Sequence, residues 1–424
     1  MTPDISAQSP LRACSALPAR SLPSIRDRVL DRWRSVFLVI AAVACGWIGW
    51  SGHVLALPVA MLFPGLWAMA PSRFVAALVS AGYFLAASRG LPQGVANFYA
   101  ADFWPGLLLW VGASLSFVAV HAAGWPSPVR GRPGKGHPGS GRAVRYLVAA
   151  VLMGLPPFGI AGWAHPLTAA GVLLPGWGWW GLIATAAGLL VMTTRVWPAA
   201  AIAFGGLWLW SAATWTAPIL PDGWKAVDLE QGQMLGRDGS LEYHRDLIAT
   251  VRKAAGDGSR VLVLPESALG FWTPTVARLW QDAIGDLDIT VIAGAADVDA
   301  EGYDNVLVAI SADEARIVYR ERMPVPVSMW QPWLAWTGQG GGARARFFEN
   351  PAVEIVGSRI APLICYEQLI LWPALQSMLH SPNIIVATGN GWWTKGTSIV
   401  AIQQASTVAW AKLFDLPVVM AFNT

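Results

Sequence analysis

Hydrophobic residues are distributed unevenly along the chain, in long runs before residue 216 and in short runs after residue 220. The long runs are close to the ~20 residues that a helix needs to cross a bilayer, and several contain Gly and Pro, which membrane helices tolerate. They lie at about 35–50, 53–71, 74–90, 105–123, 145–163, 176–194 and 197–215. This pattern predicts a polytopic α-helical membrane domain of about seven helices over residues 35–216.

From residue 220 onward, charged residues return at the density of a water-soluble protein, and short apolar runs alternate with helical patterns. Strands that alternate with helices are typical of an α/β domain whose apolar strands are covered on both faces. Strands are expected at 227–229, 261–264, 289–293, 305–310, 316–319, 361–365, 384–387 and 418–421, and helices at 241–254, 276–284 and 399–413. Residues 220–424 are therefore expected to form an α/β domain with its own core.

The composition fits this division. Of 424 residues, 54% are hydrophobic and only 13% are charged, which is too apolar for an ordinary soluble protein of this length. The net charge of +3 is small and dispersed, so direct nucleic-acid binding is not expected.

The cysteine and histidine residues do not suggest a disulfide framework or a metal site. Cys14, Cys45 and Cys365 lie far apart in the sequence, and His244 and His380 have no partners at metal-ligand spacing. No metal and no organic cofactor are expected.

Basic residues indicate which side of the membrane each loop occupies. The tail at 1–34 and the loop between the fourth and fifth expected spans are both rich in Arg and Lys, which favours the cytoplasm. These residues are Arg12, Arg20, Arg26, Arg28, Arg32 and Arg34 in the tail, and Arg130, Arg132, Lys135, Arg142 and Arg145 in the loop. After seven crossings the chain leaves on the opposite face. We therefore expect a multi-pass inner-membrane protein with a periplasmic domain at 220–424.

Two of the expected strands end in residues that carry chemistry. The run 361–364 is followed by Cys365, and the run 261–264 is followed by Pro265 and Glu266. Functional groups of open α/β sheets lie beyond the carboxyl ends of strands. A thiol and a carboxylate in such positions could act as nucleophile and base. The alternative interpretations are a cysteine that only packs in the core and a solvated loop acid.

Three motifs resemble those of a known family. The runs 264–267 (Leu-Pro-Glu-Ser), 362–367 (Pro-Leu-Ile-Cys-Tyr-Glu) and 389–393 (Gly-Asn-Gly-Trp-Trp) are similar to the carbon–nitrogen hydrolase (nitrilase) superfamily. The resemblance is strongest to its membrane branch, which contains apolipoprotein N-acyltransferase, and within it to the TraB group of conjugal transfer proteins. It implies a bundle of membrane helices followed by a periplasmic αββα nitrilase-like sandwich.

The resemblance also implies a mechanism. Glu266 would take the thiol proton, Cys365 would attack an ester or amide carbonyl to give a thioester, and a lysine would stabilise the oxyanion. Water resolves the thioester in a hydrolase and an amine resolves it in an acyltransferase. Tyr366 and Glu367 would support the cysteine.

The lysine is where this sequence departs from the family. The family run Tyr-x-Lys-x-His-Leu-Val-Pro corresponds to residues 319–326, which places Glu321 at the lysine position between Arg320 and Arg322. Either arginine could supply cationic donors, with Arg322 as the catalytic candidate and Arg320 as its support, although a guanidinium is not equivalent to an ammonium. If Glu321 points inward instead, a second negative charge would raise the pKa of the thiol. A further family carboxylate falls at Met329.

Three functions follow as alternatives. The first is a Cys-dependent carbon–nitrogen hydrolase or acyltransferase that acts on a lipid-proximal substrate, a membrane lipid or a lipoprotein, in conjugal plasmid transfer. The second is an inactive nitrilase-fold scaffold that binds components of the conjugation apparatus. The third is a true apolipoprotein N-acyltransferase. The related acyltransferases continue beyond the strand expected at 418–421 with more strands and a final membrane helix. Either this protein dispenses with them or the sequence is part of a longer chain.

Overall fold

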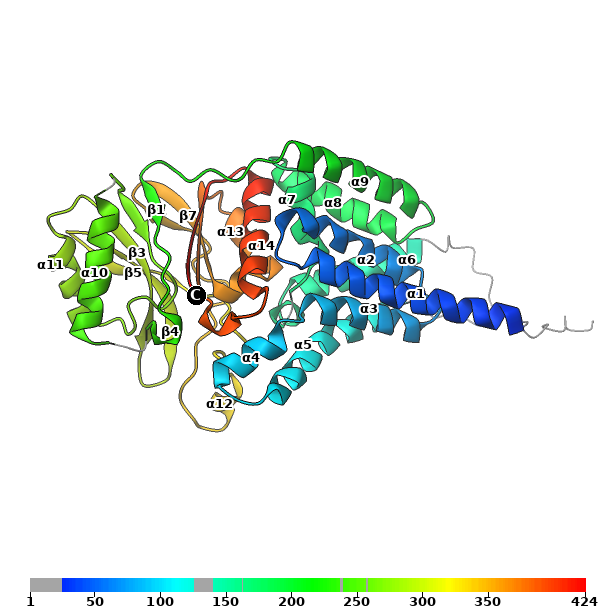
Figure 1. Cartoon of the computed structure of the whole chain (residues 1–424), viewed down its shortest axis with the longest axis horizontal. Coiled ribbons are helices and arrows are strands. Elements are labelled where there is room, and N and C mark those ends of the chain that lie inside the picture. Colours follow the sequence, from blue (N-terminus) through cyan, green and yellow to red (C-terminus); the bar gives the residue numbers. More distant parts are fainter. Residues whose placement is uncertain (1–24, 126–139, 162, 237–238, 257) are drawn as a thin grey trace, which may run out of the picture.

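The chain folds into a helical region followed by an α/β domain (Figure 1). The structure, a computed structural model, describes residues 25–125, 140–161, 163–236, 239–256 and 258–424. The expected cytoplasmic tail up to residue 24 and most of the expected basic loop, at 126–139, lie outside the described residues.

The helical region contains helix within every one of the expected apolar runs. Its elements are α1 (Ile25–Gly49), η1 (Val54–Leu62), α2 (Phe63–Ala68), α3 (Arg73–Ala87), α4 (Leu91–Tyr99), α5 (Phe103–Gly124), α6 (Ser140–Gly154), η2 (Phe158–Ile160), η3 (Pro166–Ala169), α7 (Ala170–Leu173), α8 (Gly178–Met192) and α9 (Trp197–Ala213). The run expected at 145–163 is helical only to Gly154, because Pro156 and Pro157 supply no backbone N–H for a continuing helix.

Few of these helices are long enough to cross a bilayer by themselves. Among the described residues, α5 with 22 residues is long and apolar enough to cross a membrane, and α3 and α4 are so only together, as a pair bent by 48°. The helical character of the region is thus confirmed.

The strands of the described α/β domain form two sheets. The first has the order β1 (Trp224–Ala226), β2 (Val261–Val263), β3 (Thr290–Val298), β4 (Tyr303–Ile310) and β5 (Ala315–Arg320). The second has the order β6 (Val353–Ile355), β7 (Ser358–Ile364), β8 (Ile384–Asn390) and β9 (Val418–Asn423). The strands β1, β2 and β3 are parallel, as are β7, β8 and β9, so the chemistry-bearing ends of β2 and β7 belong to parallel parts of the two sheets.

The two sheets pack face to face and helices cover their outer faces. Val263 and Ile292 of the first sheet share one buried cluster with Ile364, Val386 and Val419 of the second. The helices α10 (Leu241–Ala255) and α11 (Pro274–Ile284) lie on the outer face of the first sheet, and α13 (Leu371–Met378) and α14 (Ile399–Phe414) lie on the outer face of the second. This is the expected αββα arrangement.

The sequence pattern missed or displaced some elements. The first strand is 224–226 rather than 227–229, although Val227 and Leu229 continue in an extended path and donate backbone hydrogen bonds to Val263 and Phe422. The short helix α13 was not expected, because it has only eight residues, is buried on most of its surface and contains Pro373.

The helix α14 connects the two parts of the molecule. One side of it covers the second sheet, and Ile402 and Ala409 on the other side belong to the core of the helical region. The contact is close: a Cβ atom on Gly171 of α7 would lie 1.8 Å from the carbonyl oxygen of Ala409, so only glycine fits there. The helical region is therefore fixed against the α/β domain.

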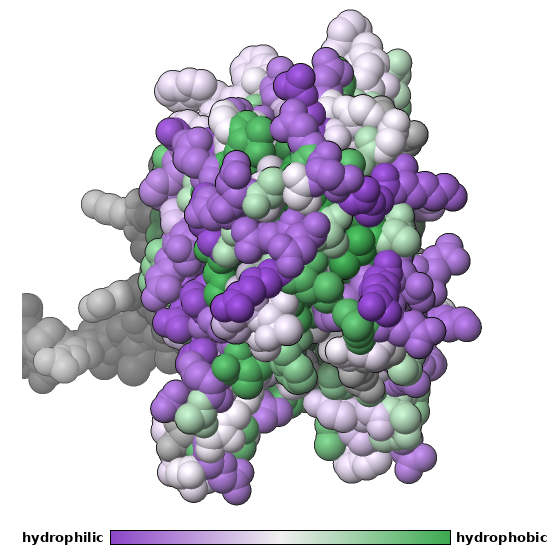
Figure 2. All heavy atoms as spheres, turned by 90° about the vertical axis from the view of Figure 1, so that its left-hand side faces the viewer, coloured by the Kyte–Doolittle hydropathy of each residue, from purple (hydrophilic) through white to green (hydrophobic). Residues whose placement is uncertain are grey.

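The end of the α/β domain farthest from the helical region is predominantly hydrophilic. Figure 2 shows this face, where polar and charged side chains dominate and apolar ones lie between them. Such a surface is that of a domain in water.

Candidate active site

Cys365 and Glu266 each occupy the turn that follows a buried strand. The strand β7 ends at Ile364, and Cys365 begins a 3₁₀ turn, η5 (Cys365–Gln368), with φ of +44°. Two residues after β2 comes Pro265, then Glu266, and the next residue, Ser267, has φ of +63°. Residues other than glycine rarely adopt a positive φ, and those that do cluster at functional sites. The cysteine itself is one of them.

The two side chains meet in the buried space between the sheets. Cys365 and Glu266 line the same pocket, and each affects the pKa of the other. From α14, Gln403 donates through Nε2 to the carbonyl oxygen of Cys365 at 2.9 Å and lies 3.7 Å from Sγ. A carboxylate that shares a pocket with a thiol is placed to take its proton, which is the requirement for an activated sulfur nucleophile.

One side-chain amide holds two carboxyl groups of the site. Nδ2 of Asn305, on β4, donates to Oε1 of Glu266 at 2.8 Å and to Oε2 of Glu321 at 2.8 Å. The other oxygen of Glu266 accepts from the backbone N–H of Asn390 at 3.0 Å, at the end of β8. Among the described residues, Oε1 of Glu321 has no hydrogen-bond partner, although the side chain is buried.

Burial changes the titration of all these groups. It is the largest cause that raises the pKa of Glu266, of Glu321 and of Cys365. A negative charge on Glu266 or on Glu321 raises the pKa of Cys365 further. Glu321 therefore points inward, which was one of the two alternatives that the sequence left open. Because its pKa is raised, the thiol of Cys365 stays protonated until a base removes its proton.

Arg322 does not face the thiol. Its side chain is fully buried beside Glu367, and all five guanidinium N–H groups donate elsewhere. Nε donates to Tyr319, Nη1 to the carbonyl oxygen of Pro373 and to Gln376, and Nη2 to the carbonyl oxygen of Pro362 and to Ser377, at 2.8–3.2 Å. With no N–H left over, Arg322 cannot bind an oxyanion in this arrangement, which corrects the role expected for it.

Glu367 is the anion that Arg322 balances. Its carboxylate also accepts from the hydroxyl of Tyr319 at 2.6 Å and from the backbone N–H groups of Arg322 and Ile364, each at 2.8 Å. Because these bonds join η5 to the end of β5, Glu367 fixes the turn that carries Cys365. Its position is that of a supporting residue.

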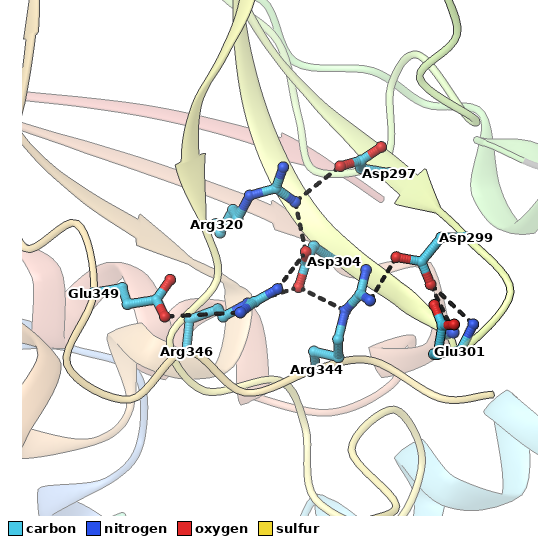
Figure 3. Close-up of polar contacts among 9 residues, drawn as sticks. Asp297, Asp299, Glu301, Asp304, Arg320, Arg344, Arg346 and Glu349 are labelled. Carbon is cyan, nitrogen blue, oxygen red and sulfur yellow. Dashed lines mark hydrogen bonds and ion pairs between the residues drawn. The ribbon is translucent and has the colours of Figure 1, made fainter. Parts of the chain in front are cut away.

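Arg320 also points away from the thiol. Figure 3 shows it in a cluster around Asp304, a buried residue of β4 whose carboxylate accepts from Arg320, Arg344 and Arg346. Side chains alternate along a strand. Asp304 therefore faces the arginines while its neighbours Tyr303 and Asn305 face the site, and the cluster ties residues 344–346 to the strand that positions Asn305.

A pocket of about 570 Å³ opens onto Cys365 and Glu266. Its polar end includes Tyr303 and Asn390. Its apolar walls come from α4, α5, the segment 325–329 and the tryptophans after β8, with Val95, Phe98, Leu108, Gly112, Val325, Met329, Trp392 and Trp393 among them. The pocket therefore joins the helical region to the thiol.

Direct contacts keep these walls together. The hydroxyl of Tyr366, next to the nucleophile candidate, donates to the carbonyl oxygen of Ile160 at 2.8 Å. Nδ2 of Asn97 in α4 donates to the carbonyl oxygen of Trp393 at 2.9 Å. Tyr366 thus links the turn of Cys365 to the helical region.

Some residues of the site were not expected from the sequence. Asn305 and Tyr303 stand at the start of an apolar strand, where polar residues also occur for purely structural reasons, and Gln403 lies in a helix far along the chain. Asn390 belongs to the motif at 389–393, which marked the segment without indicating the role of its backbone N–H.

Sequence comparisons with known proteins agree on the family. A sequence model of the carbon-nitrogen hydrolase family matches residues 85–412. Conjugal transfer protein TraB of Agrobacterium fabrum is 70% identical over 425 residues, 100% of both chains. Probable conjugal transfer protein TraB of Sinorhizobium fredii is 62% identical over 394 residues, 93% of this chain and 99% of the other. Among solved structures, an amidase of the nitrilase superfamily from Nesterenkonia AN1 is similar at 12% identity, with a TM-score of 0.36 over 48% of this chain and 79% of the amidase.

Proposed function

The chain belongs to the carbon–nitrogen hydrolase family and within it to the TraB conjugal transfer proteins, and on this basis we propose that it is a membrane-bound Cys-dependent enzyme that acts in plasmid transfer. Cys365 is the nucleophile and Glu266 is the base. The substrate is an amide or ester that enters from the lipid side, such as a membrane lipid or a lipoprotein.

The observation that carries this proposal is the position of the thiol–carboxylate pair. The pair lines a pocket that is also lined by apolar residues of α4 and α5. Ligand pockets have this composition, with a few converging polar groups in an apolar surface. The apolar wall would bind a hydrocarbon chain and place its carbonyl group at the thiol.

The surface of the helical region supports a membrane location with several crossings. Large apolar side chains are exposed on several helices, for example Phe37 at 67%, Trp180 at 75%, Ile202 at 76% and Leu209 at 71%. Exposed apolar surface of this extent is costly in water and is expected in lipid. With the basic segments in the cytoplasm, the α/β domain at 220–424 would be periplasmic.

The reaction follows from the contacts at the site. Glu266 takes the thiol proton as sulfur attacks the carbonyl carbon, so a C–S bond forms and the π-electron pair moves to oxygen. When the carbonyl re-forms, the C–N or C–O bond breaks and the leaving group takes the proton from Glu266. An amine or water, deprotonated by Glu266, then attacks the thioester, and the thiolate leaves and regains the proton.

One observation favours a second candidate, an inactive scaffold of the conjugation apparatus. Both Glu266 and Glu321 raise the pKa of Cys365, and Arg322 is occupied elsewhere. A site that had lost its chemistry could tolerate such an arrangement. The two candidates differ in whether an acyl group ever becomes attached to Cys365.

Intact mass spectrometry tests this difference. The purified full-length protein in detergent is incubated with host membrane lipids, beside Cys365→Ser and Cys45→Ser variants. We expect a hydroxylamine-sensitive acyl adduct on the wild type and on Cys45→Ser but not on Cys365→Ser. The absence of any adduct, together with full plasmid transfer by a well-expressed Cys365→Ala strain, would favour the scaffold.

A further inference from the structure

We propose that a second pocket, between α6, α8 and α13, binds one acyl chain of a phospholipid from the periplasmic leaflet, and that this chain completes the packing of α13 beside the turn of Cys365. The bound lipid is a structural component and not a substrate. The inference rests on the membrane location in the proposed function, but not on the chemistry of Cys365.

The second pocket has a volume of about 530 Å³ and lies where the helical region meets the α/β domain (Figure 1). Residues of α6 and α8 line one side of it, and α13 with Phe348 and Leu379 lines the other. It shares no described lining residue with the pocket that opens onto Cys365 and Glu266. A substrate in the first pocket would therefore leave the second one free.

The lining of the second pocket has the character of a hydrocarbon. Apart from Gln376 and the hydroxyl of Tyr146, its described lining residues are aliphatic, aromatic or glycine, and none of them is charged. A charged headgroup or a polar peptide would lose its hydrogen bonds to water there without replacement, whereas a hydrocarbon chain has none to lose. The part of the ligand that enters the pocket is therefore apolar.

The pocket follows the helices over the depth of one leaflet. Its lining residues run from Trp179 to Leu190 on α8 and from Tyr146 to Gly154 on α6. At 1.5 Å per residue these stretches are about 16 Å and about 12 Å long, close to half of a hydrocarbon core of ~30 Å. Trp179 packs against Phe414 of α14 at the end nearest the α/β domain, and tryptophan is enriched where acyl chains meet headgroups. This depth fits one phospholipid chain with its headgroup at that end.

The rim of the pocket exposes apolar side chains from both parts of the molecule. Phe348 and Leu379 of the α/β domain are 72% and 70% exposed, and Leu147 and Val151 of α6 are exposed opposite them. Exposed apolar surface of this kind marks a site of contact with lipid or protein. It contrasts with the hydrophilic far end of the same domain in Figure 2. A chain in the pocket would cover the apolar rim on both sides.

The size of the pocket favours a lipid chain over a helix of a partner protein. A helix with its side chains is about 10 Å wide and rises 5.4 Å per turn, so a volume of about 530 Å³ holds little more than one turn. A single acyl chain is much thinner and fits along the length of the pocket. We therefore assign the pocket to a lipid chain.

The helix α13 connects the second pocket to the candidate active site. It has only eight residues, and Leu371 and Leu375 line the pocket. The same helix accepts three hydrogen bonds from Arg322, the cation that binds Glu367 in the turn of Cys365. A chain that packs against α13 therefore holds the helix in place, and with it the buried network that fixes the turn.

Photochemical labelling tests the site. The full-length protein is placed in vesicles of phosphatidylethanolamine and phosphatidylglycerol that contain a phosphatidylcholine with a diazirine in its acyl chain, and the labelled peptides are identified by mass spectrometry after irradiation. We expect label on Leu371 or Leu375 of α13. Ala186→Phe and Ala150→Phe fill the pocket from α8 and α6, and each should reduce this label about tenfold, as for a steric misfit in an apolar pocket.

The matched control is Ala187→Phe, on the neighbouring residue of α8, which is exposed and does not line the pocket. It should label as the wild type does. Label on the exposed Ile202 and Leu209 of α9 reports contact with lipid in general. Label on α9 but not on α13, or equal label on α13 in all variants, would overturn the inference and leave the membrane location intact. Absence of label from both helices would overturn both.

Two further outcomes concern the occupant. A photochemical cross-link from α13 to another protein, in place of the lipid adduct, would identify a partner and overturn the inference. Stronger labelling of α13 by a free fatty acid with the same diazirine, at equal concentration, would overturn the choice of a phospholipid.

Amide hydrogen exchange tests the link between the lipid chain and the turn of Cys365. The peptide that contains η5 and α13 should exchange more slowly in vesicles than in delipidated detergent solution. This protection by lipid should be lost in Ala186→Phe and kept in Ala187→Phe. The same effect of lipid in both variants would show that α13 does not depend on the chain.

Discussion

The carboxyl groups of Glu266 and Glu321 lie on either side of a single nitrogen atom, Nδ2 of Asn305, at 2.8 Å from each. Because one amide satisfies both acids, and because the charge of Glu266 is a cause of the raised pKa of Glu321, the two titrate as a pair. Removal of either acid should change the pKa of the other acid, and removal of the amide should change the pKa of both.

Replacement of Asn305 by alanine should destabilise the protein. Two buried carboxyl groups would each lose a hydrogen bond, at about 1–3 kcal/mol per unsatisfied group. Thermal unfolding of the detergent-solubilised protein measures the effect as a lower Tm. The exposed Asn383→Ala is the matched control and should change stability by no more than about 0.5 kcal/mol. An unchanged Tm in Asn305→Ala would mean that water replaces the amide without penalty.

The stability of the wild type should fall with rising pH in a way that Glu321→Gln removes. The pKa of Glu321 is raised above its ordinary value of 4.5 by burial and by the charges of Glu266 and Glu367. Above pH 4.5 the unfolded chain releases a proton that the folded protein keeps, so this contribution to stability is present below pH 4.5 and is lost as pH rises through the raised pKa.

The pH effect is measured as Tm from pH 5 to pH 8. One proton corresponds to a slope of at most about 1.36 kcal/mol per pH unit, and Glu321→Gln should show a correspondingly flatter curve. The exposed Glu354→Gln is the control and should follow the wild type. Parallel curves for wild type and Glu321→Gln would show that Glu321 is ionised in the folded protein.

Arg322→Met should be among the most damaging single substitutions in the α/β domain. It leaves Glu367 buried without its cation, and breaking one partner of a buried ion pair costs about 3–5 kcal/mol. Arg359, whose pair with Glu354 is exposed, supplies the control Arg359→Met, for which a loss of about 0–1 kcal/mol is expected. Folded yield and Tm measure both. Similar losses in the two variants would contradict the buried network.

Gly112→Leu should narrow the pocket without disturbing its chemistry. Gly112 lines the pocket on α5, and a Cβ there would meet no described atom within 4 Å. Acylation of Cys365 by a long-chain donor should fall by about tenfold or more, whereas alkylation by iodoacetamide should not change. The control is Gly205→Leu on α9, where a Cβ also meets no described atom within 4 Å. Equal acylation of both variants would exclude α5 as the chain-binding wall.

The sequence predicted the strand-end positions of Cys365 and Glu266 because each follows a short apolar run of strand length. The sequence could not decide which of Arg320, Glu321 and Arg322 faces the thiol. Consecutive residues of a strand face opposite sides of the sheet, so a shift of the alignment by one residue exchanges the two sides. The hydrogen bonds that Arg322 donates to the carbonyl oxygens of Pro362 and Pro373 and to the hydroxyl of Ser377, all remote in sequence, decide where its side chain points. No local pattern contains that information.

In the helical region, hydropathy located the helices well but not their ends. The run 145–163 reads as one apolar stretch, yet it is divided after Gly154, and the run 53–71 is divided into η1 and α2. Apolar composition indicates that a segment prefers an apolar environment. The residues at which the helices end depend instead on prolines and on tertiary contacts.

The position of α14 between the helical region and the second sheet has a consequence for the order in which the parts of the protein fold. Tyr366 and its partner Ile160 are 206 residues apart, and α14, which completes the core of the helical region, comes later still. During synthesis the first helices therefore wait, with one face uncovered, until the α/β domain has emerged and folded. Contacts of such long range slow folding and expose intermediates to aggregation. A fragment that begins at residue 220 would conversely present the uncovered side of α14 to water, so we expect assisted folding for the whole chain and poor solubility for the isolated domain.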